Sequence, residues 1–120
     1  MASTQKTYAL ILGIVLLLVG ILGFFSNPIV GMDGYFTTNM YQNILHVVVG
    51  LIGIYCGTKT MGKGFNMWTG WIALIVGILG FVPVASDQLA SLLNINSAIS
   101  ILHVVIGIVS LAVYYMAEKM

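Results

Sequence analysis

Long apolar runs alternate with short polar segments along the chain. Four runs, at residues 8–25, 41–57, 68–85 and 98–116, are apolar over nearly their whole length. A helix that crosses a bilayer needs about 20 mostly apolar residues. The segments between the runs carry Gly, Pro, Asn, Asp or Ser, which are typical of turns. The pattern therefore predicts an all-α membrane protein with four transmembrane helices.

The same pattern occurs twice. The motif "VGILGF" is found at residues 19–24 and again at 76–81, and "ILHVV" at 44–48 and again at 101–105. Both pairs share one offset, 57 positions, because 103 − 46 = 57 for the two histidines. Self-similarity at a fixed spacing indicates an internal repeat. We therefore predict one transmembrane domain, residues 1–120, built from two parallel helical-hairpin repeats, residues 1–57 and 58–120, related by a pseudo-two-fold axis along the membrane normal.

The composition supports a membrane location. Hydrophobic residues make up 60% of the chain and charged residues 6%, whereas a soluble domain carries about 25% charged residues. The surface must therefore face lipid, and the bilayer is the first expected partner. A net charge of +1, with four lysines and no arginine, excludes nucleic acid as a natural partner. With Cys56 as the single cysteine, no intrachain disulfide can form.

The charged residues divide between the two ends of the predicted helices. All four lysines lie near the N-terminus, in the middle loop or near the C-terminus, and two aspartates lie in the other two loops: Lys6, Lys59, Lys63 and Lys119 against Asp33 and Asp87. Lysine-rich segments stay on the cytoplasmic side of a membrane. We therefore expect both termini to be cytoplasmic, in a bacterial inner or photosynthetic-type membrane.

Polar residues follow one face of the second predicted helix and recur in the fourth. Asn39, Asn43 and His46 are spaced four and three apart, and their counterparts at the offset of 57 are Asn96, Ser100 and His103. Such spacing places side chains on one helix face. A polar face inside a membrane helix points toward protein or a water-filled cavity. We expect the two histidines at one depth, on equivalent faces directed into the bundle.

Three roles are compatible with these histidines. In the first, each imidazole forms hydrogen bonds between helices, with the asparagines and Ser100 as partners. In the second, His46 and His103 ligate a non-covalent haem b or a chlorophyll-type pigment. In the third, they belong to a path for protons or other ions. The expectation is the first role, with no metal and no cofactor, and the other two are kept as alternatives.

Glycines recur at helix spacings in both repeats. Small residues let membrane helices approach closely, so we expect these positions to form helix-packing faces. The matched pairs are Gly13 and Gly70, Gly20 and Gly77, Gly23 and Gly80, and Gly50 and Gly107.

The connection after the third predicted helix differs from the connection after the first. Its sequence, "SDQLASLLNIN", places Leu89, Leu92 and Leu93 at spacings typical of one helix face. We predict a short helix capped by Asp87, lying along the outer membrane interface above the histidines.

The polar face also carries a family resemblance. Asn39, Asn43, His46 and Gly50 form the pattern Asn-x3-Asn-x2-His-x3-Gly, which resembles the signature of a bacterial family of small four-helix integral membrane proteins of unknown function. The chain departs from that family's pattern at Gln42 and at Ser100. The resemblance implies the four-helix fold and the paired histidines, and it implies no activity.

These features predict a protein that is not an enzyme. The predicted helices contain no carboxylate pair, and no nucleophile, base and orienting group can be assembled from them. The expected role is a small accessory or structural subunit, in contact with other membrane-protein subunits or with its own copies. Binding of a tetrapyrrole and conduction of protons or ions are the alternatives.

Overall fold

Helices form almost all of the structure. The computed structural model describes residues 4–25, 27–31 and 34–117. In these residues five helices occur: α1 (Thr4–Leu22), α2 (Met40–Lys59), α3 (Lys63–Leu79), α4 (Pro83–Leu93) and α5 (Ser97–Met116). Two short parallel strands, β1 (Val30–Gly31) and β2 (Phe36–Thr37), lie in the connection between α1 and α2. This helical content, with several helices long and apolar enough to cross a membrane, agrees with the prediction of an all-α membrane fold.

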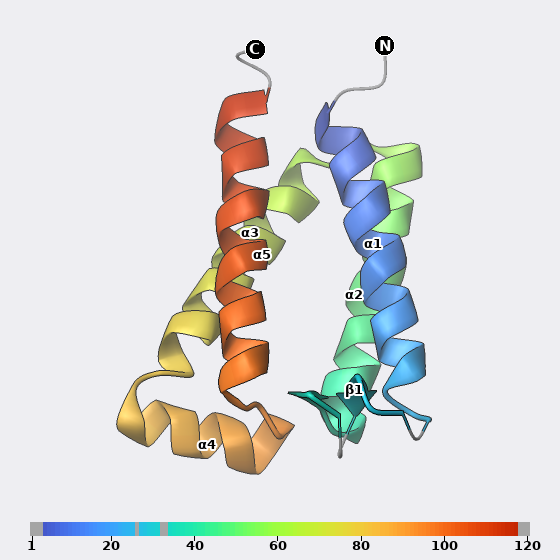
Figure 1. Ribbon diagram of the computed structural model, residues 1–120. Helices are drawn as coiled ribbons and strands as arrows, with labels where there is room; N and C mark the ends of the chain where they lie inside the picture. The colour runs from blue at the N-terminus through green and yellow to red at the C-terminus, as the bar shows by residue number, and fades with distance from the viewer. Residues whose placement is uncertain (1–3, 26, 32–33, 118–120) are drawn as a thin grey trace.

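The helices are arranged as two pairs. α1 packs along α2, and α3 packs along α5, while contacts between the pairs are fewer and involve mainly α1 with α3 and α5. Figure 1 shows the pairs side by side, with the start of α1 and the end of α5 at the same end of the molecule. We call this the terminal end, and the opposite end, which carries β1, β2 and α4, the loop end.

Three helices have the length and hydropathy of a membrane span, namely α1, α2 and α5. The predicted third span, residues 68–85, is not one straight helix. α3 begins five residues earlier, at Lys63, and ends at Leu79, and α4 leaves it at an angle of 113°. With 17 residues, α3 is about 26 Å long at a rise of about 1.5 Å per residue. A fourth span is counted only if α3 and α4 are taken together as one bent span.

Pro83 explains the break between α3 and α4. It occupies the first turn of α4, where its missing N–H costs no hydrogen bond. The residue before a proline avoids the helical region, and Val82 accordingly has φ −92° and ψ 123°. The prediction that Asp87 caps this helix is wrong, because Val82 is the N-cap and Asp87 lies inside α4.

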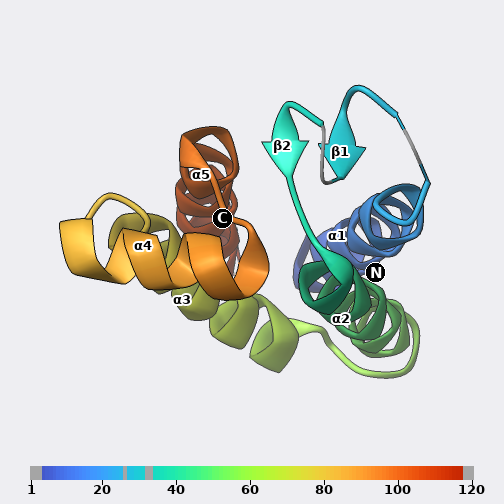
Figure 2. The same ribbon diagram turned by 90° about the horizontal axis from the view of Figure 1, so that it is seen from below.

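α4 lies across the loop end of the molecule. Seen from below, it crosses the ends of α3 and α5, and on the other side of α5 lie β2 and then β1, which is nearer α1 (Figure 2). None of its residues is buried, and Leu92 is largely exposed while Leu89 and Leu93 are half-buried. The three leucines of the predicted face are therefore unequal. α4 ends at Leu93, and the left-handed φ of 56° at its C-cap, Asn94, turns the chain into α5.

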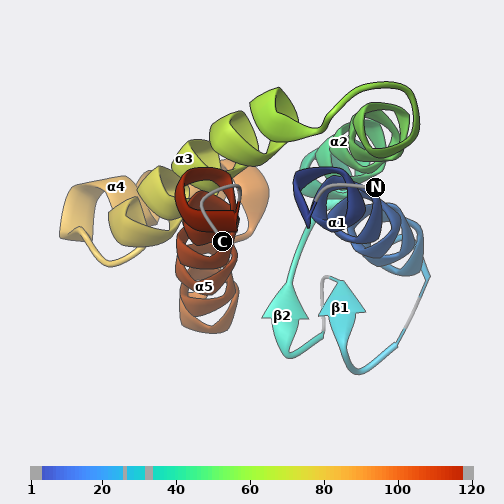
Figure 3. The ribbon, with the colours of Figure 1, turned by 90° about the horizontal axis from the view of Figure 1, so that it is seen from above.

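The packed core lies between the helix pairs, toward the terminal end. Ala9, Leu12 and Phe65 are buried there, and Leu16, Ile106 and other apolar residues pack against them. Seen from above, the start of α3 reaches across to α1 and α2 (Figure 3). Gly62 permits this approach with a φ of 78°, and a Cβ at this position would lie 2.9 Å from the Ala9 side chain.

Candidate functional site

Glycines line the seam within each helix pair. A Cβ added at Gly50 would lie 2.5 Å from the backbone nitrogen of Leu17, and one added at Gly107 would lie 2.6 Å from that of Leu74. Gly20 and Gly77 face residues that also differ by 57 positions, because a Cβ at Gly20 would meet Val47 and a Cβ at Gly77 would meet Val104. The backbones of α1 and α2, and of α3 and α5, approach closely only because these side chains are absent.

Gly13 and Gly70 are in less similar surroundings. A Cβ at Gly13 would lie 2.6 Å from the backbone nitrogen of Ile54, whereas a Cβ at Gly70 would first meet the side chain of Leu111, at 2.9 Å. The seam of the first pair is therefore tighter at this level than the seam of the second pair.

Asn43 and Ser100 point into the same seams. The side chain of Asn43 occupies the space that a Cβ at Gly23 would need, and Ser100 does the same opposite Gly80. Both side chains are buried, and Asn43 Oδ1 and Ser100 Oγ have no hydrogen-bond partner among the residues that the structure describes. These two residues thus pack within their own helix pair and do not bond to the histidines.

Asn39 and Asn96 hold the helix pairs together at the loop end. Each is the N-cap of its helix, α2 or α5, and accepts a hydrogen bond from the backbone three residues on. Each also donates across to the other pair: Asn39 Nδ2 to the Leu92 carbonyl at 2.8 Å, and Asn96 Nδ2 to the Tyr35 carbonyl at 3.0 Å. The two acceptors, Tyr35 and Leu92, also differ by 57 positions.

Further hydrogen bonds strengthen this connection. Thr37 Oγ1 donates to the Asn94 carbonyl at 2.5 Å, Gln42 Nε2 to the Leu93 carbonyl at 2.8 Å, and Asn94 Nδ2 to the Thr38 carbonyl at 3.0 Å. We call these bonds, together with those of Asn39 and Asn96, the loop-end clamp. Of these residues, the sequence pattern singled out only Asn39 and Asn96, as part of a polar helix face and not as N-caps. The other residues of the clamp could have been found from the high number of Thr, Asn and Gln residues around the starts of α2 and α5.

His46 and His103 meet between the two helix pairs. Their ring centroids lie 6.5 Å apart, and the ring planes are inclined by 58°. Both residues are half-buried, and Nδ1 of each ring is buried with no hydrogen-bond partner in the described part of the chain. The predicted bonds to Asn43 and Ser100 are not formed at these atoms. The reason is geometric, since Asn43 and Ser100 face the glycines of their own pair while the histidines face each other.

A second polar cluster, which we call the terminal-end clamp, joins α1, α3 and α5. Gln5 Nε2 donates to the Val113 carbonyl at 2.7 Å and to the Tyr114 carbonyl at 3.0 Å. Asn66 Nδ2 donates to the Gln5 backbone carbonyl and to Gln5 Oε1, both at 2.9 Å. Gln5 and Asn66 are both fully buried.

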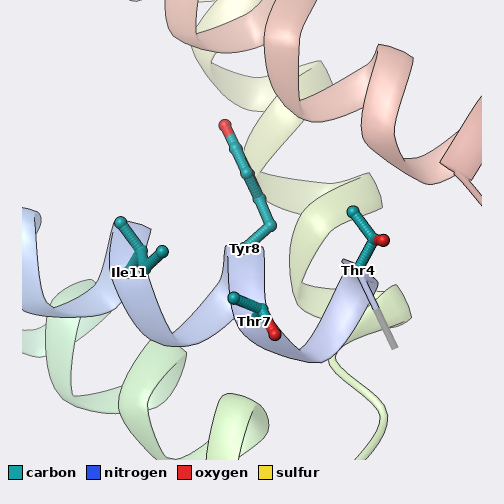
Figure 4. A pocket seen from close by; sticks show the side chains of 4 residues that line it. All are labelled: Thr4, Thr7, Tyr8 and Ile11. Atoms are coloured by element: carbon teal, nitrogen blue, oxygen red, sulfur yellow. The ribbon is translucent and has the colours of Figure 1, made fainter. Parts of the chain in front are cut away.

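Tyr8 and Ser110 complete the terminal-end clamp. Their hydroxyl oxygens lie 2.6 Å apart, which joins α1 to α5. Figure 4 shows the Tyr8 side chain leaving α1 toward the neighbouring helices, beside a shallow hollow lined also by Thr4, Thr7 and Ile11. Gln5 and Asn66 lie just before the predicted spans, residues 8–25 and 68–85, in helices that begin earlier than predicted. The hydropathy pattern therefore did not identify them.

An apolar layer separates the two clamps. Between the histidine level and Ser110 lie Leu12, Leu16, Val49 and Ile106, which pack together. On α5, His103 and Ser110 are seven residues apart, which corresponds to about 10 Å along the helix axis. The polar side chains of the described residues therefore do not form a continuous file from one end to the other.

A family model described as "Domain of unknown function (DUF4383)" matches residues 6–116 of the chain. No curated protein and no solved structure matches it.

Proposed function

Since the chain belongs to this family of unknown function, we propose its role from its own geometry: it is a small, non-catalytic membrane subunit that packs against other membrane proteins or against its own copies. One observation carries this proposal. The glycines of the seams pack against helices of the same chain, and the polar groups of both clamps form hydrogen bonds within the chain. The exposed surface is rich in large apolar side chains, which are left for contact with lipid and with other helices.

Two shallow hollows interrupt that exterior. One lies beside Tyr8 on α1, and the other is lined by Phe36 on β2 and by a face of α5 that includes Ile101 and Leu102. Association of helices within a membrane depends on close van der Waals packing. A complementary protein surface can fill such a hollow by close packing, and we assign the two hollows as the contact sites.

We also propose that the fold is a duplicated hairpin that forms four spans, from residues 1–57 and 58–120, with α3 and α4 together as the third, bent span. Three matched sets of contacts support the duplication: the seam glycines, the N-cap asparagines and the reciprocal bonds to Leu92 and Tyr35. Contacts that repeat at one offset are expected of two hairpins related by a two-fold axis.

For the orientation, we propose that the terminal end is cytoplasmic, in a bacterial inner or photosynthetic-type membrane. Lys6, Lys59 and Lys63 belong to this end and Asp87 to the loop end, and lysines favour the cytoplasmic side. Asp33 and Lys119 lie outside the described residues. A reporter fused after Met120 should be active in the cytoplasm, and activity on the other side would contradict this orientation.

The apolar layer argues against conduction of protons or ions. A conducting path needs polar groups or water along its whole length, whereas Leu12, Leu16 and Ile106 close the space between the clamps. We therefore prefer the subunit role to the ion path.

Photo-crosslinking tests the subunit role at the proposed contact sites. A photoreactive amino acid replaces Ile11 or Ile101, one in each hollow, and Ile72 serves as a matched control because the three side chains are 56%, 56% and 57% exposed. In native membranes, positions 11 and 101 should give protein adducts of defined mass, and position 72 should give few. A mass of twice 12.9 kDa would identify a second copy as the partner. Absence of protein adducts at both hollows, with a monomer in mild detergent, would refute the proposal.

A further inference from the structure

His46 and His103 lie at the same level of the two helix pairs. Each is the seventh residue of its helix, α2 or α5, which places it about 9 Å along the axis from the helix start at the loop end. The ring centroids are 6.5 Å apart, and neither buried Nδ1 has a hydrogen-bond partner within the described residues. Two imidazoles, one from each pair, are therefore close neighbours in the contact between the pairs.

From this neighbourhood, we propose that His46 and His103 form a pH-sensitive contact. While both rings are neutral, the two helix pairs stay together at the loop end, and when both rings are protonated the pairs separate there. The terminal end keeps the pairs joined in both states. This inference goes beyond the subunit role and does not depend on it.

Protonation would place two like charges side by side. Imidazole is the side chain whose charge ordinarily changes near neutral pH. The repulsion between two charges grows as their separation and the effective dielectric constant fall, and these two rings are near neighbours on helices that are otherwise almost entirely apolar. A drop in pH therefore turns a neutral contact into a repulsive one.

No carboxylate on the surrounding helices offsets this charge. The elements packed against α2 and α5 are α1, α3, α4 and β2, and α1, α2, α3 and α5 contain no Asp or Glu. Asp87 is exposed on α4, and Asp33 lies outside the described residues. The other titratable side chains of the described residues carry no negative charge at acid pH: Tyr35 and Tyr41 near the loop end, and Lys6, Tyr8, Tyr55, Cys56, Lys59, Lys63, Tyr114 and Tyr115 toward the terminal end.

The two ends of the molecule differ in how easily they can open. At the loop end, the bonds that Asn39 and Asn96 donate across the pairs are exposed, and the other bonds of that clamp are only partly buried. Water can replace such bonds at little net cost. At the terminal end, the bonds between Gln5 and Asn66 are buried, and the packed core around Phe65 lies beside them. The terminal end is therefore the hinge.

The distance between two spin labels tests the proposal. A chain with Cys56→Ala carries one label at position 41 on α2 and one at position 88 on α4, where the native Tyr41 and Gln88 are exposed. A change from about pH 8 to about pH 4, which brackets the titration of imidazole, should shift the distance distribution to longer values, and a return to pH 8 should reverse the shift. Labels at the exposed positions 58 and 112, near the terminal end, should keep their distance.

Histidine variants separate the proposed cause from general acid effects. The double variant His46→Gln, His103→Gln stays neutral and polar and should show one distance at both pH values, whereas each single variant should show a smaller shift than the parent protein. Asp33→Asn and Asp87→Asn are the controls and should respond as the parent does, with circular dichroism confirming the helical fold at both pH values. The proposal is wrong if the parent shows no shift, if the double variant keeps the full shift, if a control variant loses it, or if the terminal-end labels separate as far as the loop-end labels.

Discussion

The two helix pairs have closely similar seams and different connections. Glycines at matched positions allow α1 to pack closely on α2, and α3 on α5. A Cβ added at Gly50 or at Gly107 would lie 2.5 Å or 2.6 Å from a backbone nitrogen of the facing helix. Yet β1 and β2 connect the first pair, and the helix α4 connects the second. Close backbone contact thus tolerates very few side chains, whereas a connection at the end of a pair can change its whole structure.

The pairs also differ at the terminal end. Gly53 on α2 faces the Phe65 ring, whereas Ser110, 57 positions later on α5, meets the Tyr8 hydroxyl. At this end the contact between the halves is therefore asymmetric, and at the loop end it is reciprocal. The following substitutions test where the two pairs are equivalent.

The largest effect is expected at the seam glycines. Gly50→Ala and Gly107→Ala should each destabilise the protein by about 2–3 kcal/mol, because the new methyl group would overlap the backbone of the facing helix. The two losses should be equal within about 0.5 kcal/mol if the seams are equivalent. The measurement is the free energy of unfolding in mixed micelles, followed by tryptophan fluorescence.

Gly64→Ala is the matched control for these substitutions. Apart from its own helix turn, no described part of the chain lies within 4 Å of a Cβ at this position of α3. The change should therefore be neutral or should stabilise the helix by up to about 1 kcal/mol. A loss at Gly64 as large as the loss at Gly50 would show that helix glycines matter here for a reason other than close packing.

The next effect concerns the asymmetric end. Asn66→Ala should cost about 1–3 kcal/mol, because it leaves the buried Gln5 Oε1 without a donor. Gln88→Ala, on the exposed surface of α4, should cost less than about 0.5 kcal/mol. The measurement is the melting temperature of each variant in detergent. Equal melting temperatures for the two variants would show that the terminal-end clamp does not stabilise the fold.

The smallest effect is expected at the reciprocal end. Asn39→Ala and Asn96→Ala should each cost about 1–2 kcal/mol, because each loses a helix cap and a bond to the opposite pair. Asn39→Asp and Asn96→Asp keep the capping oxygen and lose only the donor, so they should recover part of that loss. Unfolding free energies that differ widely between positions 39 and 96 would contradict the equivalence of the two caps.

Several features of the fold were predictable because they depend on local chemistry. Asn39 and Asn96 precede apolar runs, and an asparagine in that position caps a helix in most contexts. The break before Pro83 was predictable from the proline itself, which ends or kinks a helix, although the apolar run continues through Val82 and Val84. The true cap, Val82, has no capping side chain, so the acidic residue nearby was misleading.

At the site, the sequence predicted the pairing of the two histidines but not their surroundings. The spacing of His46 and His103 places them on equivalent faces, but it does not say whether each turns toward its own pair or toward the other. That choice depends on Gly23 and Gly80, which make room for Asn43 and Ser100 within the seams. The bonds of Gln5 and Asn66 join residues 61 positions apart, a separation that no local pattern encodes.

The central claim is that the two pairs face each other through His46 and His103. Cysteines at positions 46 and 103, in a chain with Cys56→Ala, should be joined within one molecule by a short thiol-to-thiol cross-linker in intact membranes. The control pair, cysteines at positions 44 and 101, also shares the offset of 57, but the native Ile44 and Ile101 are exposed on the outer surface. The account predicts efficient intramolecular linkage of 46 with 103 and little of 44 with 101. Linkage of the control pair alone, or of neither pair, would contradict it.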